Sequence, residues 1–123
     1  MDKNEQKKLL ENLHKEEAEI LSELADFAKK NPHAEGSFSV PFPNEGNSTD
    51  ENAREIEEFE RLNILKNSLE KRLRDIRATI KKIEEDKYGQ CEKCSNKISP
   101  IRLKVIPVAR FCIDCAKQKP REA

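Results

Sequence analysis

The chain has 123 residues, with 24 Lys and Arg balanced by 24 Asp and Glu, so its formal net charge is zero. That length allows one domain, or a small domain with an extension, and argues against a large two-lobed enzyme. Charged residues make up 39% of the chain and hydrophobic residues only 35%, with three Gly. A compact sandwich or doubly wound sheet needs more apolar residues and more turn glycines, so elongated helices fit the composition better.

The sequence has no candidate transmembrane helix, because its longest wholly apolar runs are only a few residues. Its opening segment, MDKNEQKKLLENLHKEE, lacks the apolar core of a secretory signal. We therefore expect no membrane association and a cytoplasmic location.

The first expected element is a helix over about residues 2–30. Its apolar residues recur at spacings of three and four, which predicts one buried face. They are Leu10, Leu13, Ile20, Leu24 and Phe27. The Asn31-Pro32 pair should end this helix, because a residue before proline avoids the helical conformation.

Residues 31–49 form the expected connector. This loop holds two of the three Gly and three of the six Pro, which is typical of an irregular segment. Within it, Phe38, Val40 and Phe42 alternate, and we expect them to pack back on the helices.

A second, longer helix is expected over about residues 50–87, with Ser48, Thr49 or Asp50 as its cap. Its apolar residues again follow a three- and four-residue spacing. They are Ile56, Phe59, Leu62, Leu65, Leu69, Leu73, Ile76, Ile80 and Ile83. Two amphipathic helices joined by one loop pack most simply as an antiparallel hairpin. The expected fold is therefore all-α, with a two-helix coiled-coil hairpin over residues 1–87; a parallel dimer through the longer helix is the alternative.

Charge is sorted along this second helix. Between Asp50 and Glu60 there are six acidic residues and one basic residue, whereas between Lys71 and Lys82 there are six basic residues and one acidic residue. From Lys87 to Arg121 there are nine basic and two acidic residues. A solvated helix face explains why the helix is charged, but not why acidic and basic residues gather at opposite ends. We therefore expect the hairpin to be acidic at its tip and basic at its base.

All four cysteines belong to one pattern, Cys91-x2-Cys94 and Cys112-x2-Cys115, with 17 residues between the pairs. Two such pairs fit a tetrahedral four-thiolate site for one structural Zn²⁺. Disulfides would need an oxidising compartment, and two matched pairs argue against a redox dithiol. An iron–sulfur site is a further alternative that the spacing does not favour.

The zinc would hold together a small C-terminal finger over residues 88–118, followed by a tail at 119–123. The apolar residues of the finger form only a thin cluster, so metal would supply much of its folding free energy. They are Ile98, Ile101, Leu103, Val105, Ile106, Val108, Phe111 and Ile113. The sequence shows no catalytic set and no phosphate-binding glycine loop, so we expect no enzyme.

The residues in and around the cysteine pattern carry a family resemblance. They are Tyr88-Gly89, Cys91, Cys94, Ile98, Arg102-Leu103, Pro107 and Cys112-Ile113-Asp114-Cys115. This set resembles the DksA/TraR family of bacterial zinc-finger transcription regulators, and with the helices it covers residue 1 to about 118. The resemblance implies a protein that binds RNA polymerase directly, without sequence-specific DNA binding.

The resemblance also implies a mechanism. In the family the helical arm enters the secondary channel of the polymerase, and acidic residues at the arm's tip lie near the catalytic magnesium region. The family tip pattern D-x-x-D-x-A corresponds here to residues 48–53, with Ser48 at the first Asp position and Glu51 at the second. Ala53 matches the final Ala, and Asp50 could replace Ser48 only through a local shift, so the tip residues that the resemblance implies are Asp50, Glu51 and Ala53. The alarmone ppGpp is an effector that the resemblance suggests, although no residues for it carry over.

Two other functions fit the sequence. A nucleic-acid-binding zinc module would use the basic residues of the finger as its contact surface. They are Lys93, Lys97, Arg102, Lys104 and Arg110. A structural coiled-coil adaptor would instead self-associate through its acidic and basic ends, whereas the polymerase-binding interpretation predicts a monomer.

Overall fold

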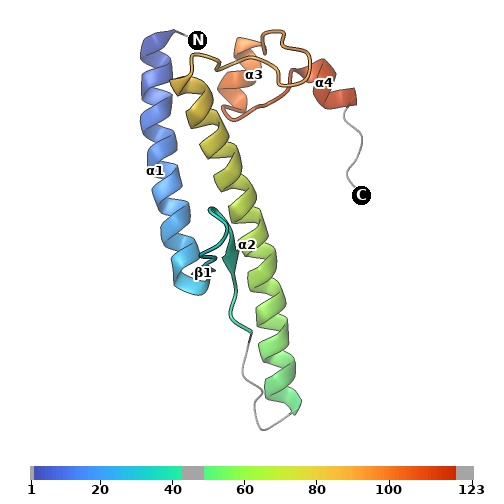
Figure 1. The fold of residues 1–123 in the computed structure, drawn as a ribbon. Helices are drawn as coiled ribbons and strands as arrows, with labels where there is room; N and C mark the ends of the chain where they lie inside the picture. Colours follow the sequence, from blue (N-terminus) through green and yellow to red (C-terminus); the bar gives the residue numbers. More distant parts are fainter. Residues whose placement is uncertain (1, 43–48, 119–123) are drawn as a thin grey trace. The chain divides into compact units, whose positions relative to one another are not determined.

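The structure is a computed structural model of the chain (Figure 1). It describes residues 2–42 and 49–118, with the backbone alone for residues 49–51. The elements are α1 (Lys3–Phe27), β1 (Lys29–Lys30), β2 (Phe38–Ser39), α2 (Thr49–Glu84), α3 (Pro100–Val105) and α4 (Ile113–Gln118). The predicted fold class is confirmed, since an antiparallel helical hairpin is followed by a small four-cysteine finger. It needs one correction, because β1 and β2 form a two-stranded sheet where no sheet was predicted.

The chain divides into two compact units. We call Met1–His14 with Ile76–Ala123 the finger unit, and Lys15–Asp75 the loop unit. Helices α1 and α2 contribute one part to each unit, and within each unit these parts run in opposite directions. The predicted division into hairpin and finger at residue 88 stays a prediction, and the predicted tail at 119–123 lies outside the described residues.

In the loop unit, α1 ends at Phe27 rather than near residue 30 as predicted. The next residues leave the helix because β1 pairs antiparallel with β2, with Lys30 opposite Phe38. The chain turns at once, since the Asn31 N–H donates to the Ser37 C=O at 2.8 Å. The predicted loop over 31–49 therefore begins with an ordered turn and a strand.

A buried carboxylate holds β2 against α2. Glu70 is only 8% exposed, and its Oε2 accepts a hydrogen bond of 2.7 Å from the Phe38 N–H. Its other oxygen lies 3.7 Å from the Lys66 ammonium, one turn earlier on the same helix. A buried charge is stable only with such partners, so Glu70 fixes where the connector meets α2.

The alternating apolar residues of the connector follow the prediction in part. Phe38 and Val40 are buried, but Phe42 stays 71% exposed. The Phe42 ring meets Phe59 of α2 edge-on, with the ring centroids 4.9 Å apart. Packing on the helices is therefore complete for two of the three side chains and limited to one edge contact for the third.

Apolar burial, with one ion pair beside it, joins α1 to α2 in the loop unit. Leu24 and Leu73 are fully buried, and burying such a side chain is worth about 1.5–3 kcal/mol. Arg72 donates two hydrogen bonds, each 3.0 Å long, to the Glu16 carboxylate. Both charged side chains remain partly exposed, so this ion pair adds much less than the leucines.

In the finger unit, α2 ends at Glu84, earlier than the predicted residue 87. The cause is Asp86, which takes the left-handed conformation with φ 57°. Its N–H donates to the Ile83 C=O at 3.2 Å, and the Lys87 N–H donates to the Lys82 C=O at 2.8 Å. These two bonds close a helix through a left-handed residue, a position that glycine usually takes. Because an aspartate stands where glycine is usual, the sequence does not indicate that the helix ends here.

The long helices of the finger unit are apolar on one side only. Leu13 of α1 and the α2 residues Ile76, Ile80 and Ile83 are buried. Their neighbours on the opposite faces are charged, as the 3.6-residue period requires of surface helices. In keeping with this one-sided pattern, none of the described helices has the length and apolarity needed to cross a membrane.

We expect Glu70→Ala to lower the free energy of unfolding by about 1–3 kcal/mol, because it leaves the Phe38 N–H without its acceptor. Urea unfolding followed by circular dichroism measures the change. The control is Glu60→Ala, at an exposed position of the same helix, which should change the same quantity by less than about 0.5 kcal/mol. Equal losses in the two variants would contradict the role given to Glu70.

Candidate metal centre

The first cysteine pair lies in a tight turn after α2. The Ser95 N–H donates to the Cys91 C=O at 3.0 Å, and the Cys91 N–H donates to the Asn96 C=O at 2.8 Å. Ser95 takes a left-handed conformation with φ 64°, which reverses the chain directly after Cys94. The turn thus brings two residues three positions apart into position to share one ligand.

The second pair uses the start of α4. Cys112 directly precedes this helix, and its C=O accepts a 2.9 Å hydrogen bond from the Ala116 N–H. Cys115 therefore follows about one helical turn later, on the same side. The two pairs are also joined through the backbone, since the Glu92 N–H donates to the Arg110 C=O at 2.9 Å.

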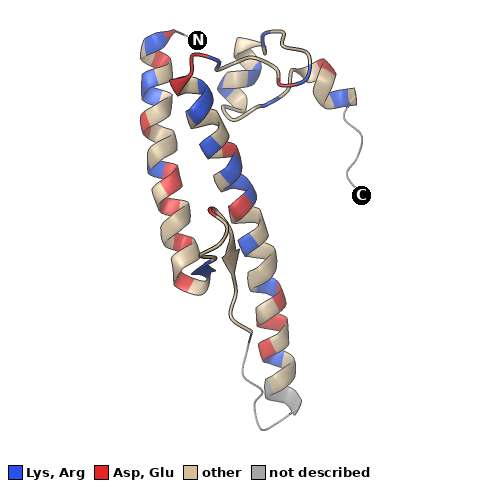
Figure 2. Ribbon diagram, in the orientation of Figure 1, with Lys and Arg blue, Asp and Glu red and all other residues tan. Residues whose placement is uncertain are grey.

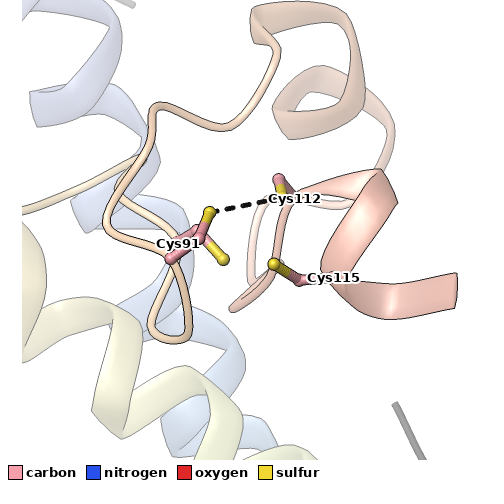
Figure 3. Close-up of side chains that lie close together, drawn as sticks. Cys91, Cys112 and Cys115 are labelled. Carbon is pink, nitrogen blue, oxygen red and sulfur yellow. Dashed lines mark hydrogen bonds between the residues drawn. The ribbon is translucent and has the colours of Figure 1, made fainter. Parts of the chain in front are cut away.

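The four sulfur atoms meet in one place (Figure 3). All four Sγ atoms lie within 4.8 Å of one another, and those of Cys94 and Cys112 are 3.7 Å apart. A tetrahedral zinc ion with Zn–S bonds of about 2.3 Å holds its sulfurs about 3.8 Å apart. The cluster therefore has the size of one zinc ion's ligand shell. Cys91 and Cys115 are buried and Cys94 is exposed, so one ligand can be reached from solvent.

The thiols of this cluster resist ionising together. Burial acts to raise the pKa of Cys91, but hydrogen bonds from the backbone N–H groups of Cys94, Cys112 and Lys93 bring it down to about 6. The pKa of Cys115 is raised to about 12 by its hydrogen bonding to the Cys112 sulfur and by its burial. One thiolate is thus favoured while a second is opposed. A divalent cation at the centre removes the conflict by compensating the negative charge.

The core of the finger includes two of the ligands. Its buried members are Cys91, Ile98, Leu103 and Cys115. Gly89 lets Leu103 close on this core, because its φ is 85° and a Cβ there would lie 3.2 Å from the leucine Cδ1.

The apolar cluster predicted for the finger is smaller than expected. The reason is that α3 and α4 are six residues each and turn one face inward, which leaves the apolar residues on the other faces in solvent. The exposed members are Ile101, Val105, Ile106 and Ile113.

Glu92, between the first two cysteines, ties the finger to the end of α2. Its carboxylate accepts a 3.1 Å hydrogen bond from the Arg110 guanidinium and lies 3.2 Å from the Lys82 Nζ. The Arg110 hydrogen bond first, and the Lys82 ammonium second, hold the pKa of Glu92 below its usual range despite partial burial. Sequence reasoning missed this role, although an acidic residue inside a basic finger was a signal that could have suggested it.

Two further hydrogen bonds close the finger. The Tyr88 hydroxyl donates to the Pro107 C=O at 2.9 Å, and burial raises the pKa of Tyr88 to about 12. The Arg102 Nε donates to the Phe111 C=O at 3.1 Å. The first bond starts from the segment after α2 and the second from α3 itself, and both end on the segment that leads into the second cysteine pair.

The five residues predicted as a basic contact surface divide into two groups. Lys93, Lys97 and Lys104 are exposed. Arg102 is half-buried and holds a backbone carbonyl, and Arg110 is paired with a carboxylate inside the finger. The contact surface stays a prediction, with its lysines the members that extend into solvent.

The predicted tip residues are only partly described. Asp50 and Glu51 fall in the first turns of α2, but their side chains lie outside the described residues, as does Ser48 altogether. Ala53 is exposed. Figure 2 shows acidic residues gathered in the first half of α2 and Lys and Arg in its second half, which matches the sorting read from the sequence. The role of the tip stays a prediction.

Residues 86–121 match the family described as prokaryotic dksA/traR C4-type zinc finger. All four cysteines lie inside this segment. This segment is therefore similar to the zinc finger of the DksA/TraR family. Its four cysteines are those of a C4 zinc site, as the sulfur geometry requires.

Two curated relatives show how far the sequence likeness extends. An uncharacterized protein from Aquifex aeolicus is 43% identical over 51 residues, which are 42% of this chain and 35% of that protein. The RNA polymerase-binding transcription factor DksA of Escherichia coli is 42% identical over 45 residues, which are 37% of this chain and 30% of DksA. The chain thus spans about a third of the length of the curated relatives that it matches.

The fold likeness covers more of the chain than the sequence likeness. The structure of transcription factor DksA2 from Pseudomonas aeruginosa superimposes with a TM-score of 0.66 and covers 95% of this chain and 84% of the other. The two are 19% identical, so the comparison shows a shared DksA fold.

We expect the purified protein to hold one zinc ion per chain and to lose the structure of α3 and α4 when the zinc is chelated, because the finger core is too small to fold alone. Elemental analysis measures the zinc, and circular dichroism with and without chelator measures the helices. Cys94→Ser should weaken zinc binding by roughly tenfold or more. Lys93→Ala, at an exposed non-ligand position of the same turn, should bind zinc as the wild type does; equal affinity in the two variants would contradict the ligand assignment.

Proposed function

We propose that this chain binds bacterial RNA polymerase and regulates transcription. The observation that carries the proposal is a sequence likeness, 42% identity over 45 residues, to a protein described as an RNA polymerase-binding transcription factor. The zinc site supports a regulatory role over a catalytic one. Four thiolates fill a tetrahedral zinc shell and leave no open position for a substrate.

The finer part of the proposal is that the helical arm inserts into the secondary channel of the polymerase. The loop unit consists of two antiparallel helical segments and one short strand pair. Each helix is about 10–12 Å across, so such a segment can enter a channel that excludes a globular domain. The buried Glu70 supports this role, because it anchors the connector to α2 and keeps it close to the helices.

Charge is the means by which the inserted end would act. The first turns of α2 carry the acidic residues Glu57 and Glu60, which are exposed, and Glu58, which pairs with Arg61. Fields from exposed charges extend over a Debye length of about 8–10 Å at physiological salt. Acidic residues held within that distance of the polymerase active centre would alter its contacts with metal-bound water and nucleic acid. Asp50 and Glu51 are the residues that we assign to this action.

Competitive binding tests both parts of the proposal. Zinc-loaded protein is titrated with RNA polymerase core enzyme from a matched host, alone and in the presence of a known secondary-channel factor. We expect binding that the competitor abolishes, because one channel admits one arm. If the competitor leaves binding unchanged, the result would contradict insertion into the channel but would still support binding to the polymerase. No binding by protein with normal zinc content and helicity would overturn the proposal as a whole.

The tip is tested by the double variant Asp50→Ala/Glu51→Ala. We expect it to bind polymerase within about twofold of wild type and to reduce the effect on open-complex lifetime about tenfold, the equivalent of ~1.4 kcal/mol in a barrier. The measurement is decay of a competitor-resistant promoter complex. Glu19→Ala/Glu23→Ala removes two exposed acidic side chains of α1 instead and is the matched control, which should keep the full effect. An undiminished effect in the first variant, with binding retained, would remove the tip from the mechanism.

A further inference from the structure

Helix α3 turns one face toward the finger core and the other toward solvent, and the solvent-facing side is unusually apolar. Leu103 points inward, is 4% exposed and belongs to the finger core. Ile101 and Val105 are one helical turn apart, away from that core, and are 76% and 75% exposed. β-branched residues are poorer helix formers than unbranched ones. The stability of α3 therefore does not account for two such side chains in solvent.

The outward face is basic as well as apolar. Lys104 stands three residues from Ile101 and next to Val105, so it lies on the same face. It is exposed and has no ion pair within the part of the chain that the structure describes. Lys97, three residues before α3, is also exposed. The acidic Glu92 is already bound within the finger unit, so it does not neutralise this face.

The structure assigns to this face, formed by Ile101, Lys104 and Val105, the role of a docking surface for a protein partner whose own surface is apolar and acidic. The assignment rests on the proposed function, in which the partner is RNA polymerase. It adds a contact made by the finger, separate from any contact made by the arm. The aliphatic pair supplies the apolar centre of the contact, and the lysine supplies its charged rim.

The chemistry of the face favours protein over nucleic acid. Phosphates would attract Lys104, but a protein–DNA interface is polar and offers little that would bury an isoleucine and a valine together. Single strands are held by aromatic side chains that stack on bases, and none of the three residues of this face is aromatic. A groove on a protein surface can bury both aliphatic side chains and also offer a carboxylate to the lysine.

Geometry favours a different protein over a second copy of this chain. Most acidic residues of this chain lie on the long helices α1 and α2, so a copy would offer one of these helices to the α3 of its neighbour. Such a head-to-tail contact leaves one face unused at each end and grows into an open assembly instead of closing. A different protein with an acidic surface can cover this face of α3 in a single contact that does not propagate.

The double variant Ile101→Ala/Val105→Ala tests the assignment. Alanine is the better helix former, and both positions are exposed, so the finger should fold; zinc content and circular dichroism check this. We expect the variant to bind RNA polymerase core enzyme about tenfold or more weakly than wild type, as when two buried contact residues are truncated. Lys104→Gln should weaken binding chiefly at low salt, because its contribution is electrostatic.

The matched control is Ile113→Ala, an isoleucine of α4 that is 53% exposed and lies outside the proposed face, which we expect to bind within about twofold of wild type. Undiminished binding by the α3 double variant would overturn the docking surface and leave the proposed function intact, whereas no binding by wild type would overturn the proposed function itself. An equal loss of binding in the Ile113 variant would remove the assignment to α3. Duplex or single-stranded DNA binding, or concentration-dependent sedimentation, that disappears with Ile101→Ala/Val105→Ala would overturn it in favour of nucleic acid or self-association.

Discussion

Four cysteine sulfurs gathered within 4.8 Å of one another are the constraint on which the finger depends. Cys91 and Cys115 are ligands and are also half of the buried core, beside Ile98 and Leu103. Metal binding and core formation are therefore one event in this part of the chain. A small domain that hides so little apolar surface gains its stability from the metal–ligand bonds. The short helices α3 and α4 are ordered by this centre more than by their own sequence.

The features that the sequence could predict are those with a period or a fixed spacing. The three- and four-residue spacing of leucine and isoleucine located both long helices, and the paired cysteines located the metal site. The ends of the helices and strands were predicted less accurately, because each end depends on single residues that adopt a backbone conformation unusual for their type. The left-handed Asp86 ends α2 where a glycine would have been the recognisable signal. The strand pair after α1 was missed because two lysines carry no strand pattern, and a distant carboxylate, Glu70, holds their partner strand in place.

Charge shows the same limit of sequence reasoning. Counting basic residues in the finger gave its net sign, but not which cations are already engaged. Arg110 is paired with Glu92, and Arg102 holds the Phe111 carbonyl, so the positive charge presented to a partner comes from lysines. Pairings of this kind join residues that lie 9 or 18 positions apart. They arise from the fold of the finger, and no local pattern announces them.

The contact between Lys82 and Glu92 has a consequence for how the chain tolerates changes in length. Each residue added to an α-helix rotates everything after it by about 100°. A single insertion between Lys82 and the stop at Asp86 would therefore turn the finger by more than a quarter of a revolution about the axis of α2 and part this ion pair. The turn between β1 and β2 imposes no such helical phase, so it can gain or lose residues at small cost. The last turn of α2 thus acts as an angular reference for the zinc centre, and length variation is best accommodated elsewhere.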